Sequence, residues 1–309
     1  MTPVDSASLL VEGPWQHRFV TANGARFHVA VAGDQDAPLV LLLHGVPQLW
    51  WAWRHQLPVL AAAGYRVAAM DLRGTGGSDK PPQGYDVPTL AADVAGVVRS
   101  LGAGSAVVVG AGTGGDVAWA TAAYHPAVVQ ALAVLGAPHP LDALALPRTP
   151  PGPAASALVA FAQLPSLPEQ AMVRGDLVDR MLTHWGGVPG LPGREAVATY
   201  RRAARVPFAA HSQLEQVRWL VRSTPRPDGR RYRAVLRAAP PLPVLQVHGL
   251  RDGLRPASTA ALRPSTATVA RPYRFELLHG AGHYLTDQAP GLVGELLVDW
   301  LAEVEPVSP

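Results

Sequence analysis

The chain of 309 residues contains no cysteine. This absence excludes disulfide bonds, a thiol nucleophile and any metal site built on thiolates. Chains without cysteine are typical of a reducing compartment, so we expect a cytoplasmic protein. No residue pattern points to a cofactor or to a metal centre, and we expect neither.

Long apolar runs are missing as well. No stretch reaches the roughly 18 apolar residues that a membrane-spanning helix needs. Residues 1–16 carry acidic residues and no basic segment ahead of an apolar one, so they do not resemble a signal peptide. We therefore expect no membrane partner. With 48% hydrophobic and 16% charged residues, the composition is that of a compact folded protein.

Lysine is nearly absent. Lys80 is the only one, so arginine supplies almost all of the positive charge behind the net charge of +3. Eleven arginines and only three acidic residues lie between Arg194 and Arg237. A solvated basic surface is the simplest interpretation, and attraction of an anionic substrate or partner is the alternative. No nucleic-acid-binding motif accompanies the charge, so we expect no nucleic-acid partner.

The first 137 residues alternate the patterns of strands and helices. Residues 18–20 and 27–31 predict a hairpin with its turn at residues 22–24. The run of residues 38–43 is wholly apolar, as in a buried parallel strand. This alternation predicts a mostly parallel sheet with helices on both faces. Further strands are expected at 65–70, 105–110 and 129–135, and helices at 50–63, 88–101 and 115–125.

The alternation stops after residue 137. Residues 138–241 are rich in Ala, Pro and Arg and show helical stretches without a strong strand. Strand patterns return at 243–247 and 273–278, and a last helix is expected at 290–304. We therefore predict an α/β core and a helical cap at the carboxyl edge of the sheet, where open α/β sheets bind ligands. The predicted boundaries are 1–137 and 242–309 for the core and 138–241 for the cap.

A glycine-rich segment joins a strand to a helix at residues 105–115. Gly110, Gly112 and Gly115 match the G-x-G-x-x-G dinucleotide fingerprint. That motif belongs to the first strand–helix unit and needs an acid about 20 residues later, and neither condition is met. The alternative is the nucleophile elbow G-x-Nuc-x-G, with Gly110 and Gly114 as its flanks. The nucleophile position is then Gly112, which adopts a positive φ easily but has no side chain.

Candidate partners of this elbow lie elsewhere in the chain. The segment His44-Gly45-Val46-Pro47 follows the first buried strand, where an oxyanion-binding N–H is expected from Val46. Its Val46–Pro47 bond is a candidate cis peptide. Asp252 and His283 each follow a later strand and complete the order nucleophile, acid, histidine. An acid that fixes the tautomer of a histidine makes it a working base, although both residues also fit ordinary loops.

Longer motifs resemble the epoxide hydrolase and haloalkane dehalogenase branch of the α/β hydrolases. The resemblance covers nearly the whole chain and implies the α/β-hydrolase fold with a cap. In that family an Asp at the elbow attacks the epoxide carbon, and water activated by the His–acid pair cleaves the ester. Two cap tyrosines donate hydrogen bonds to the opening oxygen. The motifs are His44-Gly45-Val46-Pro47-Gln48-Leu49-Trp50, Trp53-Arg54-His55-Gln56, residues 71–81, residues 249–252 and Gly280-Ala281-Gly282-His283.

The sequence departs from the family pattern at the reacting position. Gly112 stands where the family has the nucleophilic Asp, and Ala111 and Thr113 replace the His and Trp that usually flank it. The turn can persist while its side-chain chemistry is lost. We expect Thr113 to contribute a backbone N–H to an oxyanion. Covalent epoxide opening by the family's route is not expected.

The two cap tyrosines are also missing from their expected places. No tyrosine lies between Tyr124 and Tyr200, and Val217 occupies the best match for the second one. Tyr200 and Tyr232 lie nearby in the sequence, and packing within the cap is the simplest role for both. We expect an apolar pocket, as small-molecule sites usually have. The predicted substrate contacts are Pro47, Trp50 and Tyr200.

We expect the partner of the protein to be a small apolar or anionic molecule. Three functions of the protein toward this molecule remain open. In the first, the pair His283 and Asp252 acts as a general base on water or on a hydroxyl of the substrate, which leads to hydrolysis, cyclisation or elimination. In the second, the protein binds a ligand without catalysis. In the third, Asp116 or Asp142 replaces the nucleophile from a displaced position. The oligomeric state does not follow from the sequence.

Overall fold

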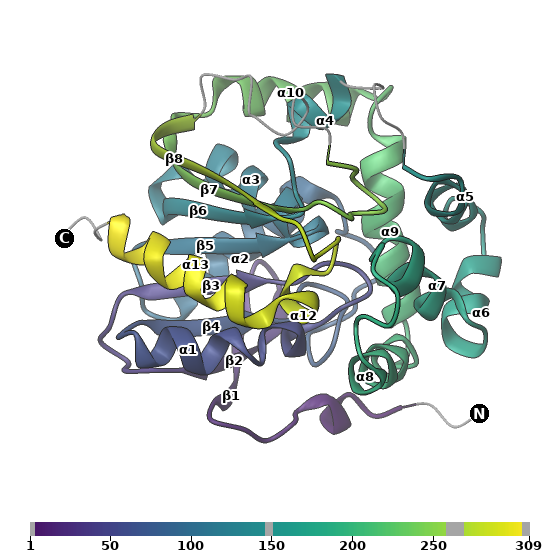
Figure 1. Ribbon diagram of the computed structural model, residues 1–309, viewed down its shortest axis with the longest axis horizontal. Coiled ribbons are helices and arrows are strands. Elements are labelled where there is room, and N and C mark those ends of the chain that lie inside the picture. The colour runs from purple at the N-terminus through teal and green to yellow at the C-terminus, as the bar shows by residue number, and fades with distance from the viewer. Residues whose placement is uncertain (1–3, 146–150, 258–268, 305–309) are drawn as a thin grey trace.

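The computed structural model describes residues 4–145, 151–257 and 269–304. Within them, one sheet of eight strands forms the centre of the molecule, in the order β1-β2-β4-β3-β5-β6-β7-β8 (Figure 1). β2 runs antiparallel to its two neighbours, and the other pairs are parallel. The predicted fold class is therefore confirmed. The strands are β1 (Gln16–Ala22), β2 (Ala25–Ala32), β3 (Leu39–Leu43), β4 (Arg66–Met70), β5 (Ala106–Ala111), β6 (Val129–Leu135), β7 (Leu242–Gly249) and β8 (Val269–Leu278).

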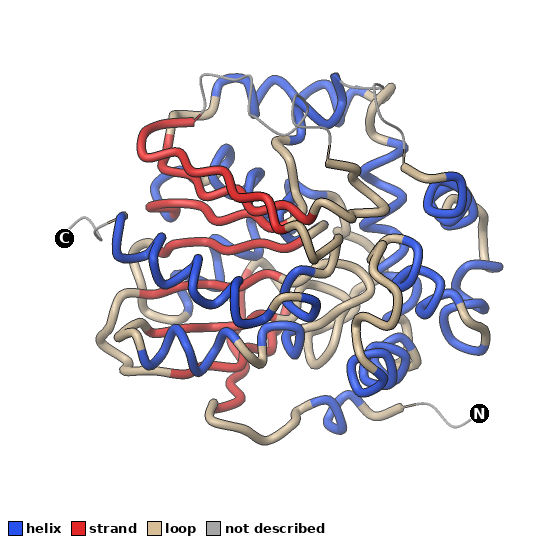
Figure 2. The backbone as a smooth tube through the Cα atoms, in the orientation of Figure 1, coloured by secondary structure: helices blue, strands red, loops and turns tan. Residues whose placement is uncertain are grey.

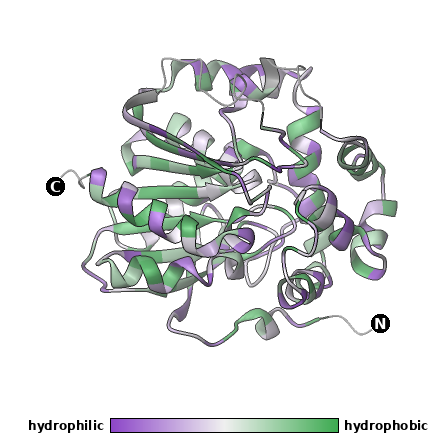
Figure 3. Ribbon diagram, viewed as in Figure 1, coloured by the Kyte–Doolittle hydropathy of each residue, from purple (hydrophilic) through white to green (hydrophobic). Residues whose placement is uncertain are grey.

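The central strands are apolar because both of their faces are covered. Every residue of β3 is buried, with Val40 and Leu42 in one apolar cluster and Leu41 and Leu43 in another. Helices lie on both sides of the red strands in Figure 2, and Figure 3 shows the hydrophobic colouring of these inner strands. Side chains on opposite faces of one strand thus anchor two helical layers. The layers are α1 (Gln56–Ala62) with α13 (Pro290–Glu303), and α2 (Val87–Ser100) with α3 (Thr113–Tyr124).

One predicted helix is divided in the structure. Residues 50–63 were expected to form a single helix, but they form a 3₁₀ turn η2 (Trp50–Trp53) followed by α1. Pro58 explains the break, because proline has no N–H for a helical bond to a carbonyl one turn earlier and is tolerated only in the first turn. Gly64, with φ +94°, lies just beyond α1, as expected.

Among the described residues, several helices lie between β6 and β7, in the segment of residues 136–241 that we call the insert. In Figure 1, α5 to α9 gather beyond one end of the strands. The insert meets the loops after β7 and β8 there, since Trp185 O accepts the Gly253 N–H at 3.0 Å and Gly186 O accepts the His283 N–H at 3.2 Å. The predicted division into core and cap at residues 137 and 242 stays a prediction. The helices are α4 (Pro140–Ala145), α5 (Pro153–Ala162), α6 (Leu167–Arg174), α7 (Leu177–His184), α8 (Arg194–Ala204), α9 (Ala209–Arg222) and α10 (Pro227–Ala238).

None of the helices in the described ranges combines the length and the apolar character needed to cross a bilayer. Two helices, α12 (Leu285–Gln288) and α13, come after the loop that follows β8, and α13 packs against α1.

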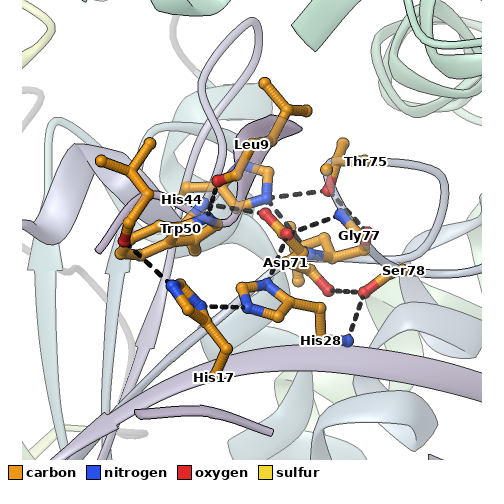
Figure 4. A network of polar contacts seen from close by, with 12 residues as sticks. Leu9, His17, His28, His44, Trp50, Asp71, Thr75, Gly77 and Ser78 are labelled. Carbon is orange, nitrogen blue, oxygen red and sulfur yellow. Dashed lines mark hydrogen bonds and ion pairs between the residues drawn. The ribbon is translucent and has the colours of Figure 1, made fainter. Parts of the chain in front are cut away.

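A buried polar network fastens the N-terminal segment to the sheet (Figure 4). His28 Nδ1 lies 2.8 Å from Asp71 Oδ2, and His28 Nε2 lies 2.8 Å from His17 Nδ1. The other oxygen of Asp71 accepts the backbone N–H of Trp50 at 2.9 Å. The indole of Trp50 in turn donates to Leu9 O at 3.1 Å. Trp50 is therefore a member of this network, at the start of η2.

Candidate active site

Gly112 forms the sharp turn between β5 and α3. Its φ of 54° and ψ of −121° suit glycine and would strain any other residue. The flanking glycines are required by close packing. A Cβ on Gly110 would lie 2.4 Å from Gly114 O, and a Cβ on Gly114 would lie 2.4 Å from Leu43 O. The backbone of the predicted elbow is thus present, held by a bond from the Gly112 N–H to Leu135 O at 2.9 Å.

Asp252 and His283 lie together at the ends of β7 and β8. His283 Nδ1 is 2.8 Å from Asp252 Oδ2, and each residue is 4% exposed. The second oxygen of Asp252 accepts the backbone N–H groups of Leu254 at 2.9 Å and Arg255 at 2.7 Å. These three bonds fix the carboxylate, and the carboxylate fixes the imidazole. The pair leaves Nε2 of His283 as the ring nitrogen available for chemistry.

That nitrogen faces the elbow. A Cβ on Gly112 would lie 3.0 Å from His283 Nε2 and 3.7 Å from His283 Cε1. The structure thus brings the three positions Gly112, Asp252 and His283 together at one edge of the sheet. A side chain at residue 112 would press on the imidazole, because 3.0 Å is closer than carbon and nitrogen normally approach.

The expected oxyanion loop also lies against the elbow. A Cβ on Gly45 would lie 2.9 Å from Ala111 O and 3.4 Å from Thr113 N. The peptide between Val46 and Pro47 is cis, as predicted, and Pro47 is buried. The N–H of Val46, however, already donates to the hydroxyl of Thr113 at 3.1 Å. An oxyanion would therefore have to share or displace that hydroxyl.

Tyr200 lies in a polar cluster between the insert and the core. Its hydroxyl donates to Asp287 at 2.6 Å, and the same oxygen of Asp287 accepts the amide N–H of Gln48 at 2.9 Å. Arg54 donates to the other oxygen at 2.7 Å. Burial raises the pKa of Tyr200 well above its ordinary value, with the nearby Asp287 carboxylate acting in the same direction. The hydroxyl proton is thus committed to Asp287. Sequence reasoning missed Asp287, because it lies 87 residues from Tyr200 and in no motif.

The side chain of Trp50 lies in the N-terminal network and not at the elbow. Its ring packs edge-on against Trp15 with centroids 5.3 Å apart, and it is fully buried. Tyr232 also lies elsewhere, against Trp219 at a centroid distance of 5.3 Å. Within the described residues, the contacts of both rings lie in these other places, so Trp50 as a substrate contact stays a prediction that its position does not favour.

Asp116 is buried on α3, one turn after the elbow. It is bound by the guanidinium of Arg255 at 2.5 Å. Burial raises the pKa of Asp116 and outweighs the opposite effect of Arg255. Arg255 escaped the sequence reasoning, although its spacing of three residues from Asp252 is typical of a turn whose N–H groups face the carboxylate. Asp142 is buried on α4, where its N–H donates to His139 O at 2.9 Å.

Among the described residues, no three of His, Asp or Glu are placed to share an ion.

The fold and this site define a class of protein. The chain belongs to the α/β-hydrolase family, since the family described as "alpha/beta hydrolase fold" matches residues 38–290. Its relatives include the "AB hydrolase superfamily protein YfhM" of Bacillus subtilis, which is 31% identical over 289 residues that cover 92% of this chain and 97% of the relative. "Epoxide hydrolase A" of Mycobacterium tuberculosis is 33% identical over 325 residues, covering 93% of this chain and 98% of the relative.

Solved structures show the same likeness. The crystal structure of epoxide hydrolase A from Mycobacterium thermoresistibile matches with a TM-score of 0.74 and 28% identity, covering 93% of this chain and 98% of that one. The resemblance drawn from the motifs is thereby confirmed at the level of α/β hydrolases with epoxide hydrolase-like homologues.

Proposed function

We propose that this protein is an epoxide hydrolase-like hydrolase that works without a carboxylate nucleophile at residue 112. One observation carries the proposal. His283 is bound to Asp252 through Nδ1 at 2.8 Å, and its Nε2 faces Gly112 at 3.0 Å from the position of a Cβ. This geometry supports His283 as a general base beside a residue that has no side chain to attack the substrate.

The base acts directly on the attacking oxygen. His283 Nε2 removes a proton from a water molecule, or from a hydroxyl of the substrate, as the oxygen forms its bond to the electrophilic carbon. The carbon–oxygen bond of the epoxide or ester breaks, and the leaving oxygen takes the proton back from the imidazolium. Asp252 stabilises the imidazolium while it exists. Water as the nucleophile gives hydrolysis, and an internal hydroxyl gives cyclisation.

Loss of the covalent step lowers the rate without abolishing it. An oxyanion site and positioning alone leave roughly 10³–10⁴-fold acceleration over water in well-studied hydrolases. Val46 and Thr113 supply the backbone N–H groups in this proposal. Rotation of the Thr113 hydroxyl away from the Val46 N–H would free the first of them.

Turnover of a panel of epoxides and esters tests the proposal. We compare the native protein with His283→Ala, and His279→Ala serves as the matched control because His279 is an exposed histidine in the same loop after β8. We expect turnover by the native protein and the control and none by His283→Ala. Turnover that persists in His283→Ala would remove the proposed base.

The origin of the added oxygen separates direct hydrolysis from a displaced nucleophile. In a single turnover in ¹⁸O-labelled water, direct attack places the label in the first product molecule. Attack by Asp116 or Asp142 places an unlabelled enzyme oxygen in the product and the label in the protein. Label in the protein would favour the displaced carboxylate over the water mechanism.

Ligand binding without catalysis is the second candidate. Two contacts favour it: the Val46 N–H is occupied by Thr113, and the Tyr200 hydroxyl is occupied by Asp287. Both are groups that a hydrolase would aim at its substrate. A protein that shows no turnover but gains thermal stability with members of the same panel would support this candidate.

A further inference from the structure

Gln213 is an anomaly in the middle of α9. Its side chain is fully buried, and within the described residues neither the amide oxygen nor the amide nitrogen has a hydrogen-bond partner. An orphaned buried amide destabilises the folded protein, and such groups are rare enough to require an explanation. The neighbouring Gln216 differs in one atom, because its amide N–H donates to Arg73 O at 3.2 Å, while its amide oxygen has no partner among the described residues either.

The bonds of neighbouring residues fix the direction of Gln213. Ser212 and Gln216 face the core, where the Ser212 hydroxyl meets Tyr85 at 2.8 Å. Arg218 faces α5 and α6, through Ala162 O at 2.8 Å and Glu169. At 100° per residue, Gln213 points between these two faces. The opposite side carries the partly exposed residues His211, Glu215, Trp219 and Arg222, and the exposed Val221 lies to one side of Gln213.

This inner side of α9 faces the large apolar cluster of the molecule. Val217, one turn after Gln213 on the same face, belongs to the buried apolar cluster that also contains Val46 and Ala111. Tyr284, the neighbour of His283, is in that cluster too, and its hydroxyl donates to Val46 O at 3.3 Å. The side chain of Gln213 therefore points into the buried interior that the insert shares with the sheet.

We propose that Gln213 is a specificity-determining residue that hydrogen-bonds a neutral hydroxyl group of the molecule bound beside His283. The assignment rests on the proposed function for the identity of the site. An amide accepts a hydrogen bond through its oxygen and donates through its nitrogen, and a hydroxyl presents both complements. A charged group is a poorer match, because the nearest cation on α9, Arg218, is already paired with Glu169 and Glu215.

Stability is the first test, and it needs no substrate. Gln213→Leu removes the orphaned amide at nearly constant volume, so we expect a higher melting temperature. Gln216→Leu is the matched control on the same helix, and we expect a lower melting temperature because its bond to Arg73 is lost. A melting temperature that falls in Gln213→Leu as it does in Gln216→Leu would mean that Gln213 is an ordinary structural residue and overturn the inference.

Ligand preference is the second test. The probes are 3-phenylglycidol and its deoxy analogue β-methylstyrene oxide, with affinities measured by calorimetry in the His283→Ala background, where the proposed turnover is absent. We expect about tenfold tighter binding of the hydroxylated probe, lost in Gln213→Leu and kept in Gln216→Leu. Equal affinities before substitution, or a preference that survives Gln213→Leu, would overturn the inference.

The two proposals fail separately. In one outcome, the native protein turns over none of the epoxides and esters while Gln213 still sets the preference for the hydroxylated probe. That result would contradict the proposed hydrolysis and support the binding role of Gln213. If turnover depends on His283 but the preference for the hydroxylated probe does not change in Gln213→Leu, the result would support the hydrolase proposal and contradict the role of Gln213.

Discussion

The Nε2 atom of His283 lies 3.0 Å from the point where a Cβ on Gly112 would stand. The imidazole thus stands closer to residue 112 than an ordinary side chain would allow, while Asp252 holds its other nitrogen at 2.8 Å. Any side chain at residue 112 therefore requires the imidazole to give way. A carboxylate restored at residue 112 would fit only after the imidazole had moved by a few tenths of an ångström.

Substitution of Gly112 by alanine therefore has two expected effects. The positive φ of 54° strains any side chain, which costs about 1–3 kcal/mol of the free energy of unfolding. The new methyl group also pushes against His283, so we expect a loss of at least about tenfold in His283-dependent turnover. Urea unfolding and the epoxide and ester panel measure the two effects.

Gly102→Ala is the control for Gly112→Ala. Gly102 has a φ of 84°, and a Cβ there would meet no described atom within 4 Å. This variant carries backbone strain without a contact, so its activity should equal that of the native protein. Equal activities of the two variants would show that His283 has room to retreat.

Asp252→Asn tests the acid of the pair. The amide oxygen can still accept the N–H groups of Leu254 and Arg255, so we expect the fold to persist. The amide nitrogen would meet His283 as a donor and favour the wrong tautomer, which lowers kcat by about 10²–10⁴-fold in comparable sites. Asp299→Asn, at an exposed position of α13, is the control. Full turnover by Asp252→Asn would exclude the pair as the base.

Trp50→Phe separates a structural role from a role in substrate binding. The variant loses the indole bond to Leu9 O and part of the packing with Trp15, so we expect the free energy of unfolding to fall by about 1–2 kcal/mol. KM should stay unchanged, because the ring lies in the N-terminal network. A raised KM with unchanged stability would support Trp50 as a substrate contact.

The backbone of the site was predictable because strand ends are predictable. Apolar runs located the strands, and the carboxyl ends of parallel strands meet at one edge. The glycine-rich turn at Gly112 and the loops with Asp252 and His283 follow such ends, so their meeting required no knowledge of side-chain directions. The same logic located the loop with Val46.

Side-chain partners were not predictable in this way. Trp50 belongs to a short 3₁₀ turn. Such a turn has no repeating pattern of apolar residues from which the direction of the Trp50 ring could be inferred. Tyr200 is bound by Asp287, and Val46 by the hydroxyl of Thr113, over 87 and 67 residues of sequence. Pairs at such separations form only when the tertiary fold brings them together, so no local pattern announces them.

His139 predicts a loss of stability in acid. Burial lowers the pKa of His139 to about 4 in the folded protein, whereas the same histidine has a pKa of about 6.5 in the unfolded chain. Between pH 6.5 and pH 4, His139 binds a proton in the unfolded chain but not in the folded protein. Stability present above pH 6.5 is therefore lost as the pH falls towards 4, by about 3 kcal/mol in total.

The variant His139→Asn isolates this effect. Asparagine does not titrate, and its oxygen can replace the ring nitrogen that accepts the Leu141 N–H at 3.3 Å. Chemical unfolding between pH 7 and 4 should show a shallower decline for the variant than for the native protein. Parallel curves for the two proteins would assign the acid sensitivity to other groups.

The ion pair of Asp116 and Arg255 predicts a non-additive pair of substitutions. Each single change, Asp116→Leu or Arg255→Leu, leaves a buried charge without its partner and should cost about 3–5 kcal/mol. The double variant leaves neither charge, so its loss should be smaller than the sum of the single losses. Urea unfolding of the four proteins gives the coupling energy, and additive losses would mean that the 2.5 Å contact contributes nothing.

The same pair bears on the displaced nucleophile. Because the Asp116 carboxylate is held by Arg255, it is not free to attack a carbon beside His283. Asp116→Asn should therefore keep its His283-dependent turnover, and single turnovers in ¹⁸O-labelled water should still place the label in the product. Loss of turnover in Asp116→Asn with a melting temperature equal to that of the native protein would instead make Asp116 a reacting group, and the direct attack of water would have to be abandoned.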